Sequence, residues 1–235
     1  MTPGQIILAY HGCDITVRDR LVRGQLDGLR PSSNGYDWLG KGVYLFEGDP
    51  DRALRFAESV RDHPRRFLSA KPIVNPTVVG VVLGISRCWD MTTIEGRREY
   101  QSAFSALQAT RQMAGRCMPV NDAGAGADDV KLLRALDCAV FNIGHETRER
   151  QGEQPHELVR ASFHQGQPIR DGTDFRTGSH IQLALRDPSC VVGWFLPRRI
   201  GSALLNEREL ADADRAMSEA IKARTASKPR VLAPR

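Results

Sequence analysis

The sequence predicts an α+β domain, and three observations lead to that prediction. Short apolar runs of strand length recur along the chain, and longer segments between them carry apolar residues at helical spacing. Hydrophobic residues make up 41% and charged residues 26% of the 235 positions, as in a chain with an ordinary core. Neither GxGxxG nor GxxxxGK[ST] occurs, so the sequence supports neither a doubly wound dinucleotide fold nor a P-loop.

Six segments have the composition of strands. The longest is rich in β-branched residues and has a break at Asn75-Pro76. The last two flank the sequence Arg186-Asp-Pro-Ser189, which is typical of a tight turn. In order, the predicted strands are Ile6–Tyr10, Lys41–Phe46, Ile73–Ile85, Cys138–Asn142, His180–Leu185 and Cys190–Leu196.

Five segments have helical signals. Asp14 or Thr16 can cap the first helix, and Gly28 is expected to end it. Asp49-Pro50 is a cap followed by proline at the first helical position, which strongly favours a helix start. The predicted helices run from Asp14 or Thr16 to Leu26, from Asp49 to before Pro64, and over Glu95–Arg116, Asp128–Ala135 and Ala203–Ala223; a loop is expected over 115–129.

The charge is unevenly distributed. The net charge is +5, but the stretch from Arg198 to Arg235 holds nine basic and five acidic residues, so the tail carries most of the excess. A nucleic-acid-binding domain usually clusters its basic residues on the folded body, so this asymmetry weakens that interpretation. We predict one domain over residues 1–200, an amphipathic helix over 201–224 and a disordered basic tail over 225–235.

The cysteines and the apolar runs indicate a cytoplasmic protein. There are five cysteines without CxxC spacing, which favours neither a disulfide framework nor a zinc site. No apolar run approaches the ~20 residues needed to span a bilayer. The N-terminus lacks a basic region and a cleavage site for export, so we expect no membrane association.

Three short motifs carry groups that can bind a ligand. Leu8-Ala-Tyr-His-Gly12 places an imidazole and an unhindered amide at the end of a strand, although such a histidine often only closes a strand. Gly40-Lys-Gly-Val-Tyr44 lets the backbone approach a flat ligand and adds a stacking ring, although a tight strand entry has the same composition. His180-Ile-Gln182 places two polar side chains on one face of a strand, which on an edge strand is simply the wet face.

Taken together, the motifs resemble the NAD-binding half of diphtheria-toxin-like ADP-ribosyltransferases, which include the poly(ADP-ribose) polymerases. That family has a histidine on the first strand, a tyrosine in GKG[IV]YF and a glutamate on a late strand; here the triad reads His11, Tyr44 and Gln182. The resemblance covers Ile6–Ala57 well and Phe163–Pro197 more weakly. It implies the ADP-ribosyltransferase fold, with two packed, mostly antiparallel β-sheets forming an NAD cleft between flanking helices.

The resemblance also implies roles for single residues. His11 would hold ribose hydroxyls of NAD, Gly12 the nicotinamide carboxamide, and Tyr44 would stack on the nicotinamide ring. Arg30 would lie near the adenosine half, where a guanidinium suits phosphate or adenine. Gly42 would let the backbone approach the ligand. The loop from Pro31 to Trp38 would cover the adenosine, with Tyr36 or Trp38 as lid aromatics or as ordinary packing residues.

Two departures from the family pattern bear on the activity. Arg52 and Arg55 stand near the places where polymerase members have a serine and a second tyrosine that clamp nicotinamide. Gln182 can hydrogen-bond the nicotinamide ribose but cannot act as a general base, so we do not expect polymer formation. Glu47 is a substitute carboxylate, or else a cap of the helix that starts at Asp49-Pro50.

The sequence therefore predicts a mono-ADP-ribosyltransferase that uses NAD to modify a protein or a nucleic acid. Family membership would fit a bacterial toxin or defence effector, held in check by an antitoxin or another inhibitor protein. The alternative is a catalytically inactive module that binds NAD or ADP-ribose and signals through a partner.

Overall fold

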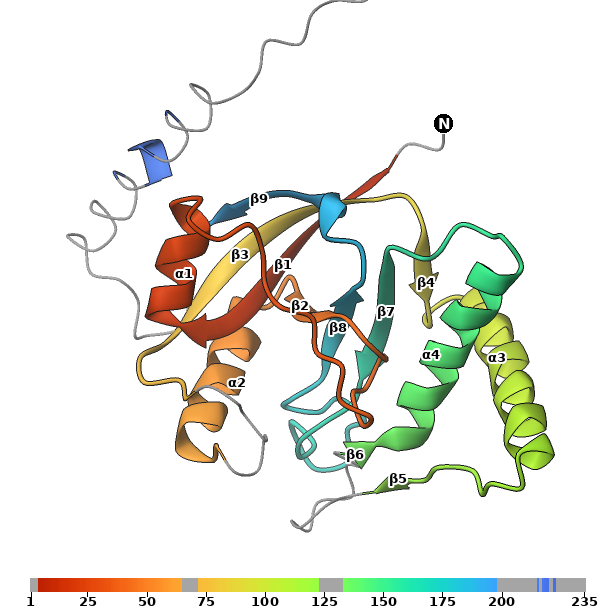
Figure 1. Cartoon of the computed structure of the whole chain (residues 1–235). Coiled ribbons are helices and arrows are strands. Elements are labelled where there is room, and N and C mark those ends of the chain that lie inside the picture. The colour runs from red at the N-terminus through yellow and green to blue at the C-terminus, as the bar shows by residue number, and fades with distance from the viewer. Residues whose placement is uncertain are drawn as a thin grey trace, which may run out of the picture.

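The computed structural model describes residues 4–64, 72–122, 133–197, 215, 217–219 and 222. Within them the chain is α+β, as predicted, with one seven-stranded mixed sheet and a two-stranded sheet (Figure 1). The elements are β1 Gln5–Asp14, α1 Ile15–Val22, β2 Val43–Glu47, α2 Pro50–Asp62, β3 Pro76–Ile85, β4 Cys88–Asp90, α3 Ile94–Met113, β5 Asn121–Asp122, β6 Leu133–Arg134, α4 Ala135–Arg150, β7 Leu158–Phe163, β8 His180–Leu185 and β9 Val191–Phe195.

The large sheet has the order β4-β7-β8-β2-β1-β3-β9. The pair β4·β7 is parallel and the other pairs are antiparallel. The prediction of two packed sheets is corrected here, because the strand groups β4-β7-β8-β2 and β1-β3-β9 belong to one sheet. Two residue pairs join the halves, Ala9 with Glu47 and Tyr10 with Phe46. Beyond Tyr10, β1 continues along β3 alone, and β2 continues along β8.

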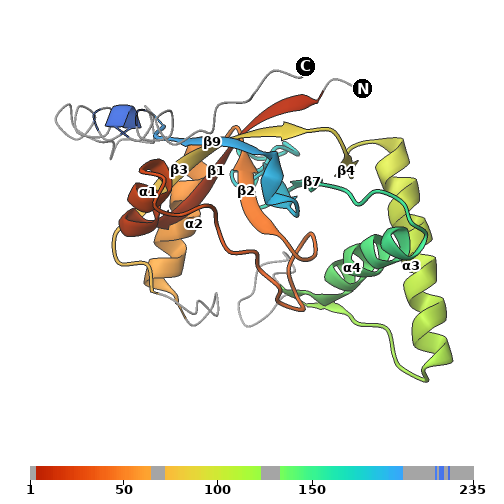
Figure 2. The same ribbon diagram turned by 45° about the horizontal axis from the view of Figure 1, so that its top comes forward.

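Helices cover the two faces of the sheet unequally. α2 packs near β1 and β3 at one end, and the α3–α4 pair packs beside β4 and β7 at the other (Figures 1 and 2). Phe46 and Ala53 pack together at the α2 end, and Ala184 and Phe141 belong to the cluster under α4. Both helical groups therefore lie on the face that carries the even-numbered side chains of β2 and β8. α1 packs on the opposite face, through Leu21.

Two glycines permit close packing at the α3–α4 end. Trp89 is fully buried and donates a hydrogen bond from its ring nitrogen to the carbonyl of Gly96, at 2.9 Å. A Cβ on Gly144 would lie 2.5 Å from the Trp89 ring, and one on Gly96 would lie 2.0 Å from the Asp90 carbonyl oxygen. Any larger residue at either glycine would therefore push α3 or α4 away from the sheet.

Local signals set the helix starts as predicted. The Asp49 side chain accepts from the Arg52 amide and caps α2, and the Asp14 side chain caps α1. Asp14 also accepts from the amides of Val74 and Asn75, at 2.9 Å each, so it ties the start of α1 to the segment before β3. The predicted end of the first helix is wrong: α1 ends at Val22, followed by Gly24 in the left-handed region with φ 67°.

Three predictions about elements are corrected. Residues 138–142 lie inside α4 rather than in a strand, because a short apolar run does not distinguish a strand from a buried helix turn. The predicted helix over 128–135 is replaced at its described end by β6, and α4 begins only at Ala135. The strands β4 and β7 were not predicted, and β5 lies within the expected loop over 115–129.

Most of the C-terminal predictions lie outside the described residues. Of the predicted helix over 201–224, the described residues 215, 217–219 and 222 are helical. Met217 packs against the cluster of Cys13, Leu21 and Val79 beside α1. The predicted tail over 225–235 lies wholly outside the described part of the chain.

Candidate functional site

The three residues of the predicted triad lie where β1 and β2 stop pairing. His11 is the first residue of β1 after the last pair with β2, and its Nδ1 donates to the backbone oxygen of Tyr44, at 2.8 Å. Since a carbonyl can only accept, the imidazole carries its proton on Nδ1 when neutral. Nε2 is then an acceptor. The His11 side chain thus bridges β1 and β2 beyond their last residue pair, and its Nε2 can accept a hydrogen bond from another partner.

Burial keeps the His11 imidazole neutral. Desolvation lowers the pKa of His11, and the hydrogen bond to Tyr44 opposes this only in part. Because the lowered pKa lies below the ordinary value of about 6.5, the ring is uncharged at pH 7. A neutral acceptor of this kind matches a ribose hydroxyl.

Tyr44 and Gln182 project from the same face of the sheet. Tyr44 stands opposite Ala184, and Gln182 stands opposite Phe46 on β2, so Tyr44 and Gln182 are diagonal neighbours. Diagonal pairs have Cα atoms about 7–8 Å apart, within the reach of long side chains. His11 projects from the other face, because Tyr10 is the residue that stands opposite Phe46. The structure thus places Tyr44 and Gln182 on one face of neighbouring strands, and His11 is linked to Tyr44 through its backbone carbonyl.

The hydroxyl of Tyr44 is held by the loop before β2. It donates to the Gly40 carbonyl, at 2.7 Å, and accepts from the Leu39 amide, at 2.8 Å. Burial raises the pKa of Tyr44 well above its ordinary value, so the phenol stays protonated. Both bonds fix the ring, which also packs against the cluster that includes Leu39 and Ala184.

Gln182 is partly buried, and its acceptor oxygen is unpaired within the described part of the chain. Its Oε1 is shielded from solvent and has no hydrogen-bond partner among the described residues. Arg52 Nε and His180 Nε2 share this property. The Arg52 guanidinium and the His180 ring each lie 5.2 Å from the Phe46 ring, and Phe46 is the strand partner of Gln182. Two of these three residues therefore lie next to the Phe46 ring, and the third is the strand partner of Phe46.

Gly12 is needed for packing. A Cβ at this position would lie 2.0 Å from the backbone oxygen of Ala53 on α2, so only glycine fits. The Leu8 carbonyl accepts from the Gly48 amide, beyond the end of β2. Backbone groups alternate along an antiparallel strand, so those of Gly12 point toward the same side. They point toward the β2 side, beyond the last residue pair of β1 and β2.

The structure does not favour two other predicted cofactor contacts. Both backbone groups of Gly42 are taken by Ser32: the Ser32 amide donates to the Gly42 oxygen, at 2.8 Å, and the Gly42 amide donates to the Ser32 oxygen, at 3.1 Å. Arg30 is exposed on the connection between α1 and β2. Gly42 thus serves the turn, and Arg30 can meet only a ligand that extends over this loop.

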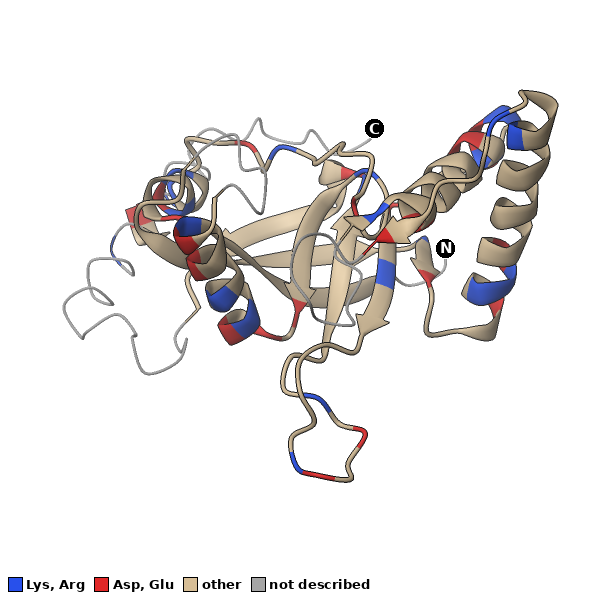
Figure 3. Cartoon of the chain, turned by 90° about the horizontal axis from the view of Figure 1, so that it is seen from below, with Lys and Arg blue, Asp and Glu red and all other residues tan. Residues whose placement is uncertain are grey.

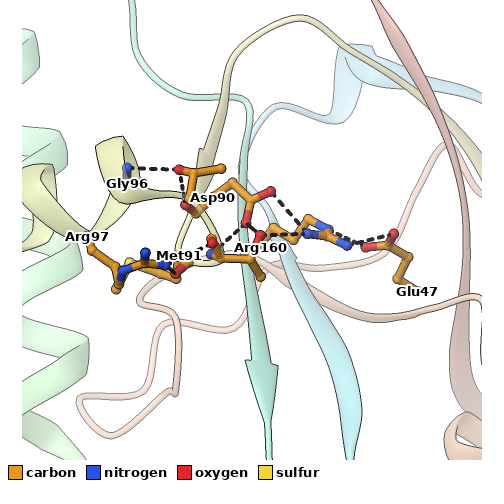
Figure 4. A network of polar contacts seen from close by, with 8 residues as sticks. Glu47, Asp90, Met91, Gly96, Arg97 and Arg160 are labelled. Carbon is orange, nitrogen blue, oxygen red and sulfur yellow. Dashed lines mark hydrogen bonds and ion pairs between the residues drawn. The ribbon is translucent and has the colours of Figure 1, made fainter.

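Glu47 lies on the opposite face from Gln182 and is held in an ion pair (Figure 4). Its two oxygens accept from Arg160, with Nε–Oε2 at 2.6 Å and Nη2–Oε1 at 3.2 Å. Arg160 also donates to Asp90, at 3.0 Å, so the network links β2, β7 and β4. Glu47 is therefore not a free carboxylate, and the cap of α2 is Asp49 instead.

Arg134 of β6 and the first two turns of α4 hold the loop that was predicted to cover the adenosine. The Arg134 amide donates to the Tyr36 carbonyl, at 3.2 Å, and its guanidinium lies 4.3 Å from the Trp38 ring. The Cys138 thiol donates to the Asn34 carbonyl, at 3.3 Å, and Asn142 Oδ1 accepts from the Lys41 amide, at 3.1 Å. These contacts were not predicted, because residues 138–142 were expected to form a strand rather than part of α4. Through these contacts α4 supports the loop that precedes β2 and Tyr44.

Other features of the described residues lie away from the triad. A cavity of about 200 Å³ is lined by residues of β4, the start of α3 and His156, and it includes none of the triad. No group of three or more His, Cys, Asp or Glu residues could hold a metal ion in the described part of the chain. None of its described helices is both long and apolar enough to cross a membrane. Figure 3 shows acidic and basic residues interspersed along the helices at both ends of the sheet.

Comparisons with known proteins do not extend this picture. No family model, no curated protein and no solved structure matches the chain.

Proposed function

We propose that the chain is a mono-ADP-ribosyltransferase of the diphtheria-toxin-like type that takes NAD as its substrate. The observation that carries the proposal is the hydrogen bond from His11 to the Tyr44 carbonyl at the point where β1 and β2 part. It joins the two most specific motifs of the sequence in one place. The proposal includes the ADP-ribosyltransferase fold, with its two groups of strands joined into one sheet by the two residue pairs between β1 and β2.

In this proposal each residue has a distinct task. His11 Nε2 accepts from a ribose hydroxyl, the backbone of Gly12 holds the nicotinamide carboxamide, and the Tyr44 ring stacks on nicotinamide. Nicotinamide leaves from an oxocarbenium-like ribose, so positioning and electrostatics contribute most of the rate. Gln182 orients that ribose through neutral hydrogen bonds.

The acceptor in this proposal is a protein or a nucleic acid in the cytoplasm. An effector of this kind would be restrained by an inhibitor protein. Incubating the protein with labelled NAD and total lysate, followed by separate protease and nuclease digestion, identifies the acceptor. Label that resists both digestions, or no label at all, would contradict transfer to a macromolecule.

A second function is favoured by the ion pair of Glu47. With Glu47 held by Arg160 and glutamine at position 182, neither of these two positions offers a free carboxylate. A module that binds NAD or ADP-ribose without reacting would need no catalytic carboxylate. Release of nicotinamide from NAD distinguishes the two, since the transferase releases it and the binding module does not.

A further inference from the structure

His180 has an unpaired, oriented imidazole nitrogen near Gln182. It opens β8, is 7% exposed, and lies between the Phe46 and Phe163 rings, whose centroids are 5.2 and 5.7 Å from its own. Its Nδ1 donates to the Gly178 carbonyl, at 2.8 Å. Nε2 therefore carries no proton in the neutral ring, and it has no partner among the described residues.

The position of His180 links it to the proposed reaction. His180 and Gln182 alternate with Ile181 along β8, so their side chains share the face that also carries Tyr44. Buried polar atoms without partners are rare in folded proteins and destabilise them. Among the described residues, His180 Nε2, Gln182 Oε1 and Arg52 Nε share this state. His180 and Arg52 lie next to the Phe46 ring and Gln182 is the strand partner of Phe46, which supports a polar ligand beside these residues.

The surroundings keep the imidazole neutral. Burial lowers the pKa of His180 to about 4, the Gly178 carbonyl opposes this, and Arg52 lowers it further. The other charged groups that act on the ring are Asp49, before α2, and Arg134, before α4. A pKa of about 4 is close to that of an ordinary carboxylate, the group that this chain lacks at position 182.

We propose that His180 Nε2 is the general base of the transfer, and that the acceptor is a hydroxyl; this rests on the proposed function. The acceptor oxygen attacks C1′ of the nicotinamide ribose while its proton passes to Nε2. The electron pair of the C1′–N bond leaves with nicotinamide, which departs neutral. His180 then returns the proton to solvent. A carboxylate acceptor would carry no proton and would need no base, so the base has a task only with a hydroxyl acceptor, water included.

The test uses the full chain, with NAD and water as the simplest hydroxyl acceptor. His180→Ala and His180→Gln should slow nicotinamide release by about 10²-fold or more, the usual contribution of a general base. The rise in melting temperature that NAD induces should persist in both variants. Added imidazole should restore part of the rate in His180→Ala, and Ile181→Val, on the opposite face of β8, should match the wild type. ADP-ribose transferred to lysate acceptors should resist neutral hydroxylamine, which cleaves ester links to carboxylates.

Each contrary result has one meaning. Wild-type rates in the His180 variants, or slow rates that imidazole does not restore, would overturn the base while leaving the transferase proposal intact. Label released by hydroxylamine would overturn the hydroxyl acceptor. If the wild type binds NAD without releasing nicotinamide, the transferase proposal fails together with the base, and the binding module remains.

Discussion

Replacing Glu47 with glutamine distinguishes a structural from a catalytic carboxylate. In the structure, Glu47 makes two charged hydrogen bonds to Arg160, and its side chain is 22% exposed. Glutamine keeps one acceptor oxygen but turns an NH₂ donor toward the guanidinium, so one bond and the charge attraction are lost. A hydrogen bond to a charged group contributes about 1.5–3 kcal/mol. For a chain of this size, 1 kcal/mol shifts the melting temperature by roughly 2–4 °C, so we expect a fall of about 3–12 °C.

The assay combines thermal melts with nicotinamide release at a temperature where the variant stays folded. We expect Glu47→Gln to melt earlier yet to bind NAD and release nicotinamide like the wild type. Asp90→Asn is the matched control, because Asp90 forms the second ion pair of Arg160. It should also lower the melting temperature without changing nicotinamide release. An unchanged melting temperature with loss of nicotinamide release would refute this reasoning and make Glu47 the catalytic carboxylate.

Three further predictions follow from single contacts. Gly12→Ala should lower the free energy of unfolding by about 1–3 kcal/mol, measured in urea, because the new Cβ meets the Ala53 oxygen; unchanged stability would contradict that packing. Asn142→Leu should speed amide hydrogen exchange at Lys41 by about tenfold through loss of one hydrogen bond, and Asn142→Asp, which keeps the acceptor, should not. Equal exchange in both variants would show that Asn142 does not hold the loop. Burial opposes ionisation of Asp14, but its hydrogen bonds outweigh this and lower its pKa to about 2, so its stabilising effect is complete above about pH 4 and lost as the pH falls toward 2. Asp14→Ala should therefore remove this part of the acid dependence in melts between pH 5 and 2, and an unchanged dependence would contradict it.

Local signals predicted the elements that local chemistry determines. Asp49-Pro50 predicted the start of α2, and the alternating residues of His180–Leu185 predicted β8 at its observed bounds. The strand β7 was missed because its partners β4 and β8 are distant in sequence, and pairing with them is what stabilises it. The segment 138–142 was predicted as a strand because a short apolar run alone does not distinguish a strand from a buried helix turn. It lies in α4, and the packing of α4 against the sheet depends on tertiary contacts.

The site was predictable in part. The motifs predicted that His11 and Tyr44 lie together, and the hydrogen bond between them is consistent with this. The ion pair of Glu47 with Arg160 joins residues 113 positions apart, and no local pattern indicates such a pair. The role of α4 in holding the loop before Tyr44 depends likewise on contacts between distant segments, such as that of Asn142 with Lys41.

The most direct test of the account is NAD binding by the wild type, His11→Ala and Tyr44→Ala, measured as the rise in melting temperature that NAD induces. A ligand at 100 times its Kd stabilises the folded chain by about 2.7 kcal/mol, which is well within the range of a thermal melt. We expect a clear rise for the wild type and a much smaller one for each variant, whose apo forms still melt cooperatively. An equal rise in all three proteins, or none in the wild type, would contradict the claim that NAD binds where β1 and β2 part.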